Sequence, residues 1–206
     1  IGRGHRIAVV LPNGPELALA ILAVSCWACC VPLNAFGATA ELEADLQLAG
    51  VHLVISLHPD HSSDVSIHQL ASKVGIPCWG LIPDGKRAGI FTLVPHATHA
   101  VQPIPQRTGN EHTGANSLIA TSEADRSAGD VIYSNDLNFG DNMPAESLLL
   151  PNQHMDEVLV LFTSGTTGSK KLVPHLLADV LVATACISVS WNLTEKDTNC
   201  NLMPLF

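Results

Sequence analysis

The chain has 206 residues, of which 47% are apolar and 14% charged, and its formal net charge is −9. This composition can bury a core, which excludes a generically disordered chain, and the acidic balance without a basic stripe excludes a typical nucleic-acid-binding protein. Six cysteines are too few for a disulfide scaffold, so we expect reduced thiols and an intracellular protein, and the longest apolar run, residues 17–31, is too short to cross a bilayer.

Strands and helices alternate in the first part of the chain. An apolar run over residues 6–11 predicts a strand that is buried on both faces, and Pro15 suits the first turn of a buried helix that runs to about Cys30. Thr39 is expected to cap the next helix, which ends at Gly50. Further strands are expected over 31–34, 52–57 and 76–82, with a third helix from about 62 to 74. This alternation predicts an α/β fold with a mostly parallel sheet and helices on both faces.

The pattern weakens over residues 84–157, which are rich in Gly, Pro, Ser, Asn, Thr and His. We expect mostly loop there, with weak strand candidates at 89–94 and 130–133. Order returns with an apolar strand over 158–162 and an apolar helix from about Pro174 to Trp191. The chain therefore divides into a first α/β portion over 1–83, a polar insertion over 84–157 and a strand–helix unit over 158–206.

Small hydroxyl and glycine residues fill positions 163–168, and two lysines follow at 170 and 171. A backbone without bulky side chains lets consecutive N–H groups converge on one anion, and a loop after a buried strand lies at the carboxyl end of the sheet, where ligands of such folds bind. We therefore expect a polyphosphate group as the ligand of this segment. The P-loop pattern fails because Ser169 follows Gly168, which disfavours a Walker NTPase. A flexible Ser/Thr/Gly linker remains the alternative interpretation.

The segment resembles the phosphate loop of the adenylate-forming (AMP-binding) enzymes, which include acyl-CoA and aryl-CoA synthetases, luciferases and peptide-synthetase adenylation domains. Their loop reads approximately T-S-G-T-T-G-x-P-K-G, and this chain matches it except that Lys170 replaces Pro and Leu172 replaces Gly. Residues 6–21 are similar to the family's V-A-V-x-L-P-N-x-x-E-x-x-x-A, and residues 29–34 to its G-A-V-x-V-P-L-N with Cys-Cys in place of Gly-Ala. Residues 202–206 resemble the start of its M-P-L-F-H stretch.

The resemblance covers residues 1–83 and 157–206 and implies part of the large N-terminal domain of an acyl-CoA synthetase-like ligase. Such an enzyme activates a small carboxylate with ATP and Mg²⁺ to an acyl-adenylate, releases pyrophosphate and commonly passes the acyl group to coenzyme A. The ATP and pyrophosphate site would comprise Thr163, Ser164, Gly165, Thr166, Thr167, Gly168 and Lys171, with Lys170 and His175 as further candidate phosphate contacts. Within these 206 residues no catalytic residue and no metal ligand is assigned.

In that family the adenine, ribose and metal motifs, the hinge and the catalytic lysine of the C-terminal lid lie in later segments. We therefore expect a fragment that is inactive alone, whose partners are the later segments of its own chain, and which self-associates through exposed apolar faces. A non-catalytic nucleotide-binding or scaffold module, favoured by the departures at Lys170 and Leu172, and a peptide-synthetase-type adenylation domain are the alternatives. The sequence does not separate a cytoplasmic from a peroxisomal location.

Two other groups of residues invite a metal interpretation. Cys26 and Cys29 form a C-x-x-C, but they lie near the end of an apolar helix without a second pair at zinc spacing, so we expect them to pack in the core. His52, His58 and His61 surround one strand end and are expected to be solvated loop residues. We predict no metal site from either group.

Overall fold

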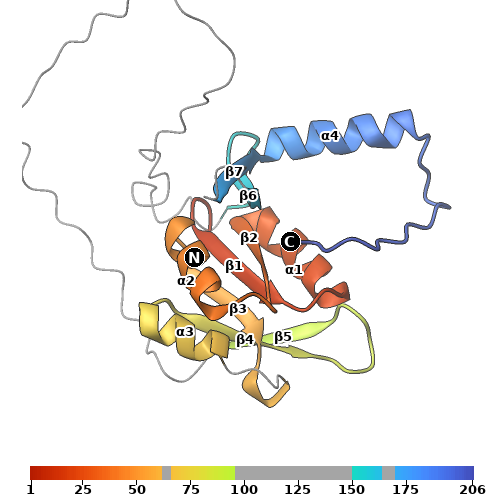
Figure 1. The fold of residues 1–206 in the computed structure, drawn as a ribbon. Coiled ribbons are helices and arrows are strands. Elements are labelled where there is room, and N and C mark those ends of the chain that lie inside the picture. Colours follow the sequence, from red (N-terminus) through yellow and green to blue (C-terminus); the bar gives the residue numbers. More distant parts are fainter. Residues whose placement is uncertain (62–65, 96–149, 164–169) are drawn as a thin grey trace, which may run out of the picture.

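A computed structural model describes residues 1–61, 66–95, 150–163 and 170–206 of the chain (Figure 1). In chain order its elements are β1 (Arg6–Leu11), α1 (Pro15–Trp27), β2 (Cys29–Asn34), α2 (Thr39–Leu48), β3 (Leu53–Leu57), a 3-10 turn (Pro59–His61), α3 (Ser66–Val74), β4 (Cys78–Pro83), β5 (Phe91–Pro95), β6 (Glu157–Thr163), β7 (Lys171–Leu176) and α4 (Leu177–Ser190). The weak strand candidate at 89–94 is confirmed as β5, and the one at 130–133 lies outside the described residues.

These strands form a seven-stranded sheet in the order β5-β4-β3-β1-β2-β6-β7. The five inner strands are mutually parallel, whereas β5 and β7 pair antiparallel at the two edges. The predicted mostly parallel α/β sheet is therefore confirmed. β6 joins the sheet beside β2, on the opposite side of β1 from β3.

Helices cover both faces of this sheet, and β1 shows why. Its side chains alternate, so Ala8 and Val10 face the core under α2 and α3, while Val9 and Leu11 face the core under α1. The predicted burial of this strand on both faces is confirmed. So is the predicted stripe of the second helix, since its apolar members are buried against the sheet: Leu42, Leu46 and Ala49.

Three expectations about the first two helices are wrong. Helix α1 ends at Trp27, three residues early, because Cys29 and Cys30 continue as strand β2. The helix is also not buried all round: it packs on the sheet by one face only and leaves Leu22 and Trp27 exposed. At α2 the backbone is already extended at Ala38, so Thr39 is the first helical residue rather than the cap.

The helix expected from Pro174 is wrong at its start. Residues 171–176 form β7, which pairs antiparallel with β6, and α4 begins only at Leu177. Proline cannot donate to a ladder, but an edge strand such as β7 has an unpaired side on which the missing N–H is tolerated. Pro174 lies opposite Val160 in this ladder.

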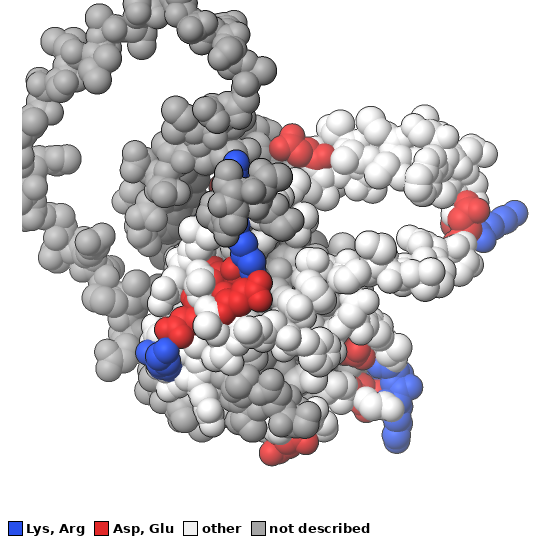
Figure 2. Space-filling view, viewed as in Figure 1, with Lys and Arg blue, Asp and Glu red and all other residues white. Residues whose placement is uncertain are grey.

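Helix α4 extends away from the sheet in Figure 1, and the chain after it returns toward α1. At this return the Leu205 N–H donates to Asn13 Oδ1 (3.2 Å), and Leu205 packs against the core under α1. The surface of α4 is almost entirely uncharged in Figure 2, and its large apolar residues Leu181, Val182, Ile187 and Val189 are exposed. In the described part of the chain, no helix is both long enough and apolar enough to span a membrane.

Candidate nucleotide-phosphate site

The expected phosphate segment begins and ends at one edge of the sheet. Thr163 is the last residue of β6 and Lys171 the first of β7, and the two oppose each other in the antiparallel ladder. Because β6 runs parallel to β2, this point lies at the carboxyl ends of the parallel strands. Thr163 and Lys171 are both exposed there. Five predicted site residues lie outside the described residues: Ser164, Gly165, Thr166, Thr167 and Gly168.

Strand β6, which ends at Thr163, is held in the sheet by its buried apolar residues. Val158 and Val160 of β6 are almost fully buried, and Leu159 lies opposite Cys30 of β2. An apolar strand held from both faces gives the following residues a rigid point of departure. The predicted strand over 158–162 is confirmed as part of β6, whereas the element that follows segment 164–169 is a strand, β7, and not the expected helix.

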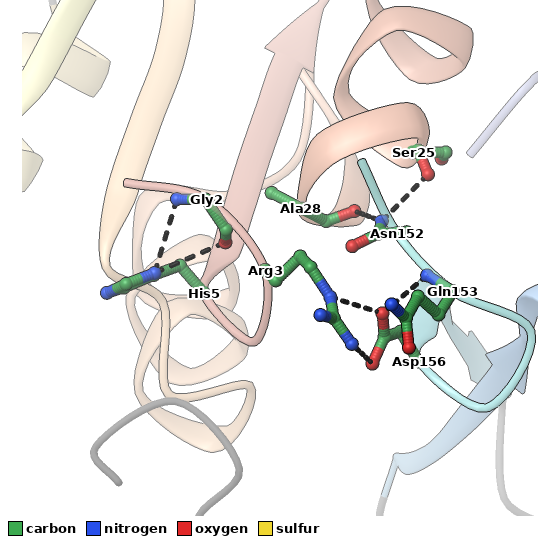
Figure 3. Close-up of polar contacts among 8 residues, drawn as sticks. All are labelled: Gly2, Arg3, His5, Ser25, Ala28, Asn152, Gln153 and Asp156. Carbon is green, nitrogen blue, oxygen red and sulfur yellow. Dashed lines mark hydrogen bonds and ion pairs between the residues drawn. The ribbon is translucent and has the colours of Figure 1, made fainter. Parts of the chain in front are cut away.

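A second set of contacts fastens the chain just before β6 to the N-terminus (Figure 3). Asp156 accepts hydrogen bonds from Arg3 Nε (2.7 Å), Arg3 Nη2 (2.9 Å) and the Gln153 N–H (2.6 Å). Burial alone would raise the pKa of Asp156, but these hydrogen bonds and the positive charge of Arg3 hold it below its ordinary value. The Asn152 side chain donates to the Ser25 and Ala28 carbonyls at the end of α1.

Lys170, which the sequence offers as a further candidate phosphate contact, forms ion pairs with α2 in this structure. Its Nζ lies 2.6 Å from Glu41 Oε1 and 2.7 Å from Asp45 Oδ2, and 5.6 Å from the centre of the Phe162 ring. Burial lowers the pKa of the lysine, yet the hydrogen bonds to Asp45 and Glu41 outweigh it and raise the pKa above its ordinary value. Figure 2 shows basic and acidic side chains together over the region of α2. Lys170 is therefore a charged member of an ion-paired cluster.

Lys171 and His175 occupy different parts of β7. Adjacent residues of an extended chain point to opposite sides, so Lys171 faces away from the side on which Lys170 meets α2. His175 lies four positions further along the strand, about 13 Å from Lys171 along the backbone, opposite Leu159. The structure thus places Lys171 beside Thr163 and leaves His175 toward the other end of the hairpin, on a strand rather than at the start of a helix.

In the described part of the chain, no group of three His, Cys, Asp or Glu residues is placed to hold a metal ion. Cys26, which we expected to pack in the core, is exposed, because it lies on the solvent side of α1. Cys29 and Cys30 are buried; burial first, and the negative charge of Glu157 second, raise the pKa of the Cys29 thiol to about 12. His68, which the sequence did not single out, is buried, with its ring 3.1 Å from Ser56 Oγ and 3.4 Å from Cys78 Sγ. His52 is not simply solvated: its Nδ1 accepts a hydrogen bond from the Arg6 N–H.

Fold and site together define an α/β protein with a hydroxyl-rich, glycine-rich and lysine-flanked segment at the carboxyl edge of a parallel sheet. The model of the AMP-binding enzyme family matches residues 1–206, and the chain belongs to this family. An acyl-CoA synthetase of Gibberella moniliformis, FUM10, is 37% identical over 75 residues, which are 34% of this chain and 14% of that protein.

Solved structures show the same fold. ATP-bound MatB from Rhodopseudomonas palustris superposes with a TM-score of 0.59 at 20% identity, covering all of this chain and 31% of MatB. The o-succinylbenzoate CoA synthetase MenE from Bacillus subtilis, in complex with an acyl-adenylate intermediate, gives 0.56 at 14% identity, covering all of this chain and 38% of MenE. The chain spans well under half the length of each of these relatives.

Proposed function

We propose that this chain supplies the ATP phosphate-binding part of an AMP-forming acid–thiol ligase, which makes an acyl-adenylate and then a coenzyme A thioester. The observation that carries the proposal is the opposition of Thr163 and Lys171 at the carboxyl edge of the sheet, in a member of the AMP-binding family. The structural neighbours support it, since MatB is ATP-bound and MenE was solved with an acyl-adenylate and with ATP and magnesium.

The residues of this segment suit the chemistry of adenylation. When a carboxylate attacks the α-phosphate, the bond to the β-phosphate breaks and pyrophosphate leaves with increasing negative charge. Backbone N–H groups, hydroxyls and the Lys171 ammonium stabilise that charge, and bound Mg²⁺ would neutralise more of it. The side chains proposed to contact the β- and γ-phosphates are Thr163, Ser164, Thr166, Thr167 and Lys171, while Gly165 and Gly168 allow close backbone approach.

Turnover is proposed to require more than these 206 residues. The chain aligns with only 31% of MatB and 38% of MenE, so most of each relative has no counterpart here. We therefore expect Mg·ATP binding without ATP–pyrophosphate exchange. Robust exchange catalysed by the 206-residue chain would contradict this part of the proposal, whereas binding without exchange even after addition of the later segments would favour the non-catalytic module.

Calorimetric titration with Mg·ATP tests the phosphate site. Replacing Lys171 by Ala removes one charge-assisted contact, for which we expect about a 10- to 100-fold weaker Kd, and Thr166→Ala should weaken binding in the same direction. Lys86→Ala, an exposed lysine in the turn between β4 and β5, is the matched control and should leave the Kd unchanged. Equal affinities of the Lys171→Ala variant and the parent chain would refute the assignment.

We also propose that the exposed apolar residues of α1 and α4 are contact surfaces. Leu22 and Trp27 of α1, with Leu181 and Val182 of α4, are each more than half exposed. Apolar faces of this kind mark interaction sites on soluble proteins. In the complete ligase the occupants would be later segments of its own chain, and in their absence a second copy. An intracellular location is proposed with the family assignment.

A further inference from the structure

Lys170 stands where the family's loop pattern has proline, and this departure coincides with an unusual contact. The lysine immediately follows segment 164–169 and precedes β7, and its ammonium is shared between two carboxylates one helical turn apart on α2, Glu41 and Asp45. On its other side the ammonium lies over the Phe162 ring of β6. The Lys170 side chain therefore connects the residue that precedes β7, and Phe162 of β6, to α2.

Burial makes this contact persistent. The side chain of Asp45 is only 8% exposed, and that of Lys170 is 34% exposed. If Lys170 swung away to reach a phosphate, the Asp45 carboxylate would stay behind without its cation in a largely dry position, which is strongly unfavourable. The lysine is thus already committed to carboxylates, whereas Lys171, on the opposite side of the strand, is exposed.

We propose that Lys170 is a positioning residue. Its ion pairs with Glu41 and Asp45 of α2 hold the start of β7 in place, and we call this connection the strap. The strap presents Lys171 to the nucleotide phosphates. This inference rests on the proposed function for its nucleotide part. In this proposal Lys170 holds the start of β7 against α2, whereas Lys171 contacts the nucleotide phosphates. The proposal also assigns α2 an indirect part in nucleotide affinity.

The variant Asp45→Asn distinguishes a strap from a phosphate ligand, because only the strap role predicts weaker binding of Mg·ATP. If Lys170 is a strap, removing the Asp45 charge loosens it, and we expect binding to weaken about 3- to 30-fold, as in Lys170→Met. The double variant should be no weaker than Lys170→Met alone, and Lys170→Arg, which keeps the charge, should restore most of the affinity. If Lys170 binds phosphate, Asp45→Asn frees it, and the affinity rises or stays constant. Either of these latter outcomes overturns the proposal.

Glu43→Gln is the matched control, because Glu43 lies on the same helix but pairs with Lys73 of α3 at the surface. It should leave the affinity for Mg·ATP unchanged, and urea unfolding of each variant confirms that binding is measured on folded protein. A second readout needs no nucleotide: in Lys170→Met, amide hydrogen exchange across residues 171–176 should accelerate relative to Glu43→Gln. Unchanged exchange refutes the strap. Absence of Mg·ATP binding by the parent chain would instead refute the proposed function, while the exchange measurement would still decide on the strap.

Discussion

Removing Arg3 should destabilise the fold by about 2–3 kcal/mol at neutral pH. The guanidinium donates two hydrogen bonds to Asp156, at 2.7 and 2.9 Å, and the two side chains are 10% and 20% exposed. Breaking a fully buried pair costs about 3–5 kcal/mol and an exposed pair about 0–1 kcal/mol. In Arg3→Met the Asp156 carboxylate keeps only the Gln153 N–H among these donors, so the cost should fall between the two limits.

The pH dependence has a definite sign. The pKa of Asp156 is lowered in the folded protein, so the carboxylate contributes stability that is fully present above its unfolded pKa of about 3.9 and is lost as pH falls through the folded value. In Arg3→Met the burial of Asp156 remains while the hydrogen bonds from Arg3 are gone. The difference in unfolding free energy between the parent chain and Arg3→Met should therefore shrink as the pH is lowered below about 4.

Urea unfolding followed by circular dichroism measures both effects. A double-mutant cycle with Asp156→Asn should return a coupling of about 1–2 kcal/mol at pH 7. Asp84→Asn, which breaks the surface pair with Arg87, is the control and should cost much less stability than Arg3→Met, because solvent screens exposed pairs. The reasoning is refuted if Arg3→Met costs no more than this control, or if its cost grows as the pH falls.

Two further predictions concern exposed groups. On size-exclusion chromatography at micromolar concentration, the chain should elute as a dimer or larger species, because apolar side chains of α1 and α4 are exposed. The double variant Leu22→Lys, Val182→Lys should elute at the volume of a monomer. A parent chain that elutes as a monomer would contradict the proposed contact surfaces. With a maleimide at pH 7, folded protein should label at Cys26, Cys186 and Cys200 within minutes, whereas Cys29 and Cys30 should label only after unfolding. Mass spectrometry of chymotryptic peptides resolves these sites, because cleavage after Trp27 separates Cys26 from Cys29 and Cys30. Fast labelling of either buried thiol would show that β2 is accessible.

Local patterns were sufficient for most of the sheet. The apolar run of β1, the stripe of α2 and the strand β6 are each encoded by neighbouring residues, and the structure confirms all three. Strand β7 was missed because the mostly apolar segment 172–177 suits a helix or a strand equally well in isolation. What decides between them is the free edge of β6, which accepts a second, antiparallel strand.

The ion pairs could not be predicted because their partners lie far apart in the chain. Lys170 and Asp45 are separated by 125 residues, and Arg3 and Asp156 by 153. One signal was present: Glu41 and Asp45 are spaced by four residues and so share a face of α2, which marks an acidic site without saying what fills it. The phosphate segment was predicted from its glycine and hydroxyl composition after a buried strand, and the family resemblance then assigned its individual residues.

The place of β6 in the sheet has a consequence for synthesis of the protein on the ribosome. Strands β1 to β5 can pair as soon as residue 95 has emerged, but β2 then forms an open edge with unpaired N–H and C=O groups. The strand that covers this edge is complete only at Thr163, which is 163 − 95 = 68 residues after the end of β5. At roughly 5–20 residues per second the edge of this five-stranded sheet stays uncovered for about 3 to 14 seconds. During that interval the nascent chain exposes a ready site for pairing with a strand of another molecule, so early docking of β6 protects it from aggregation.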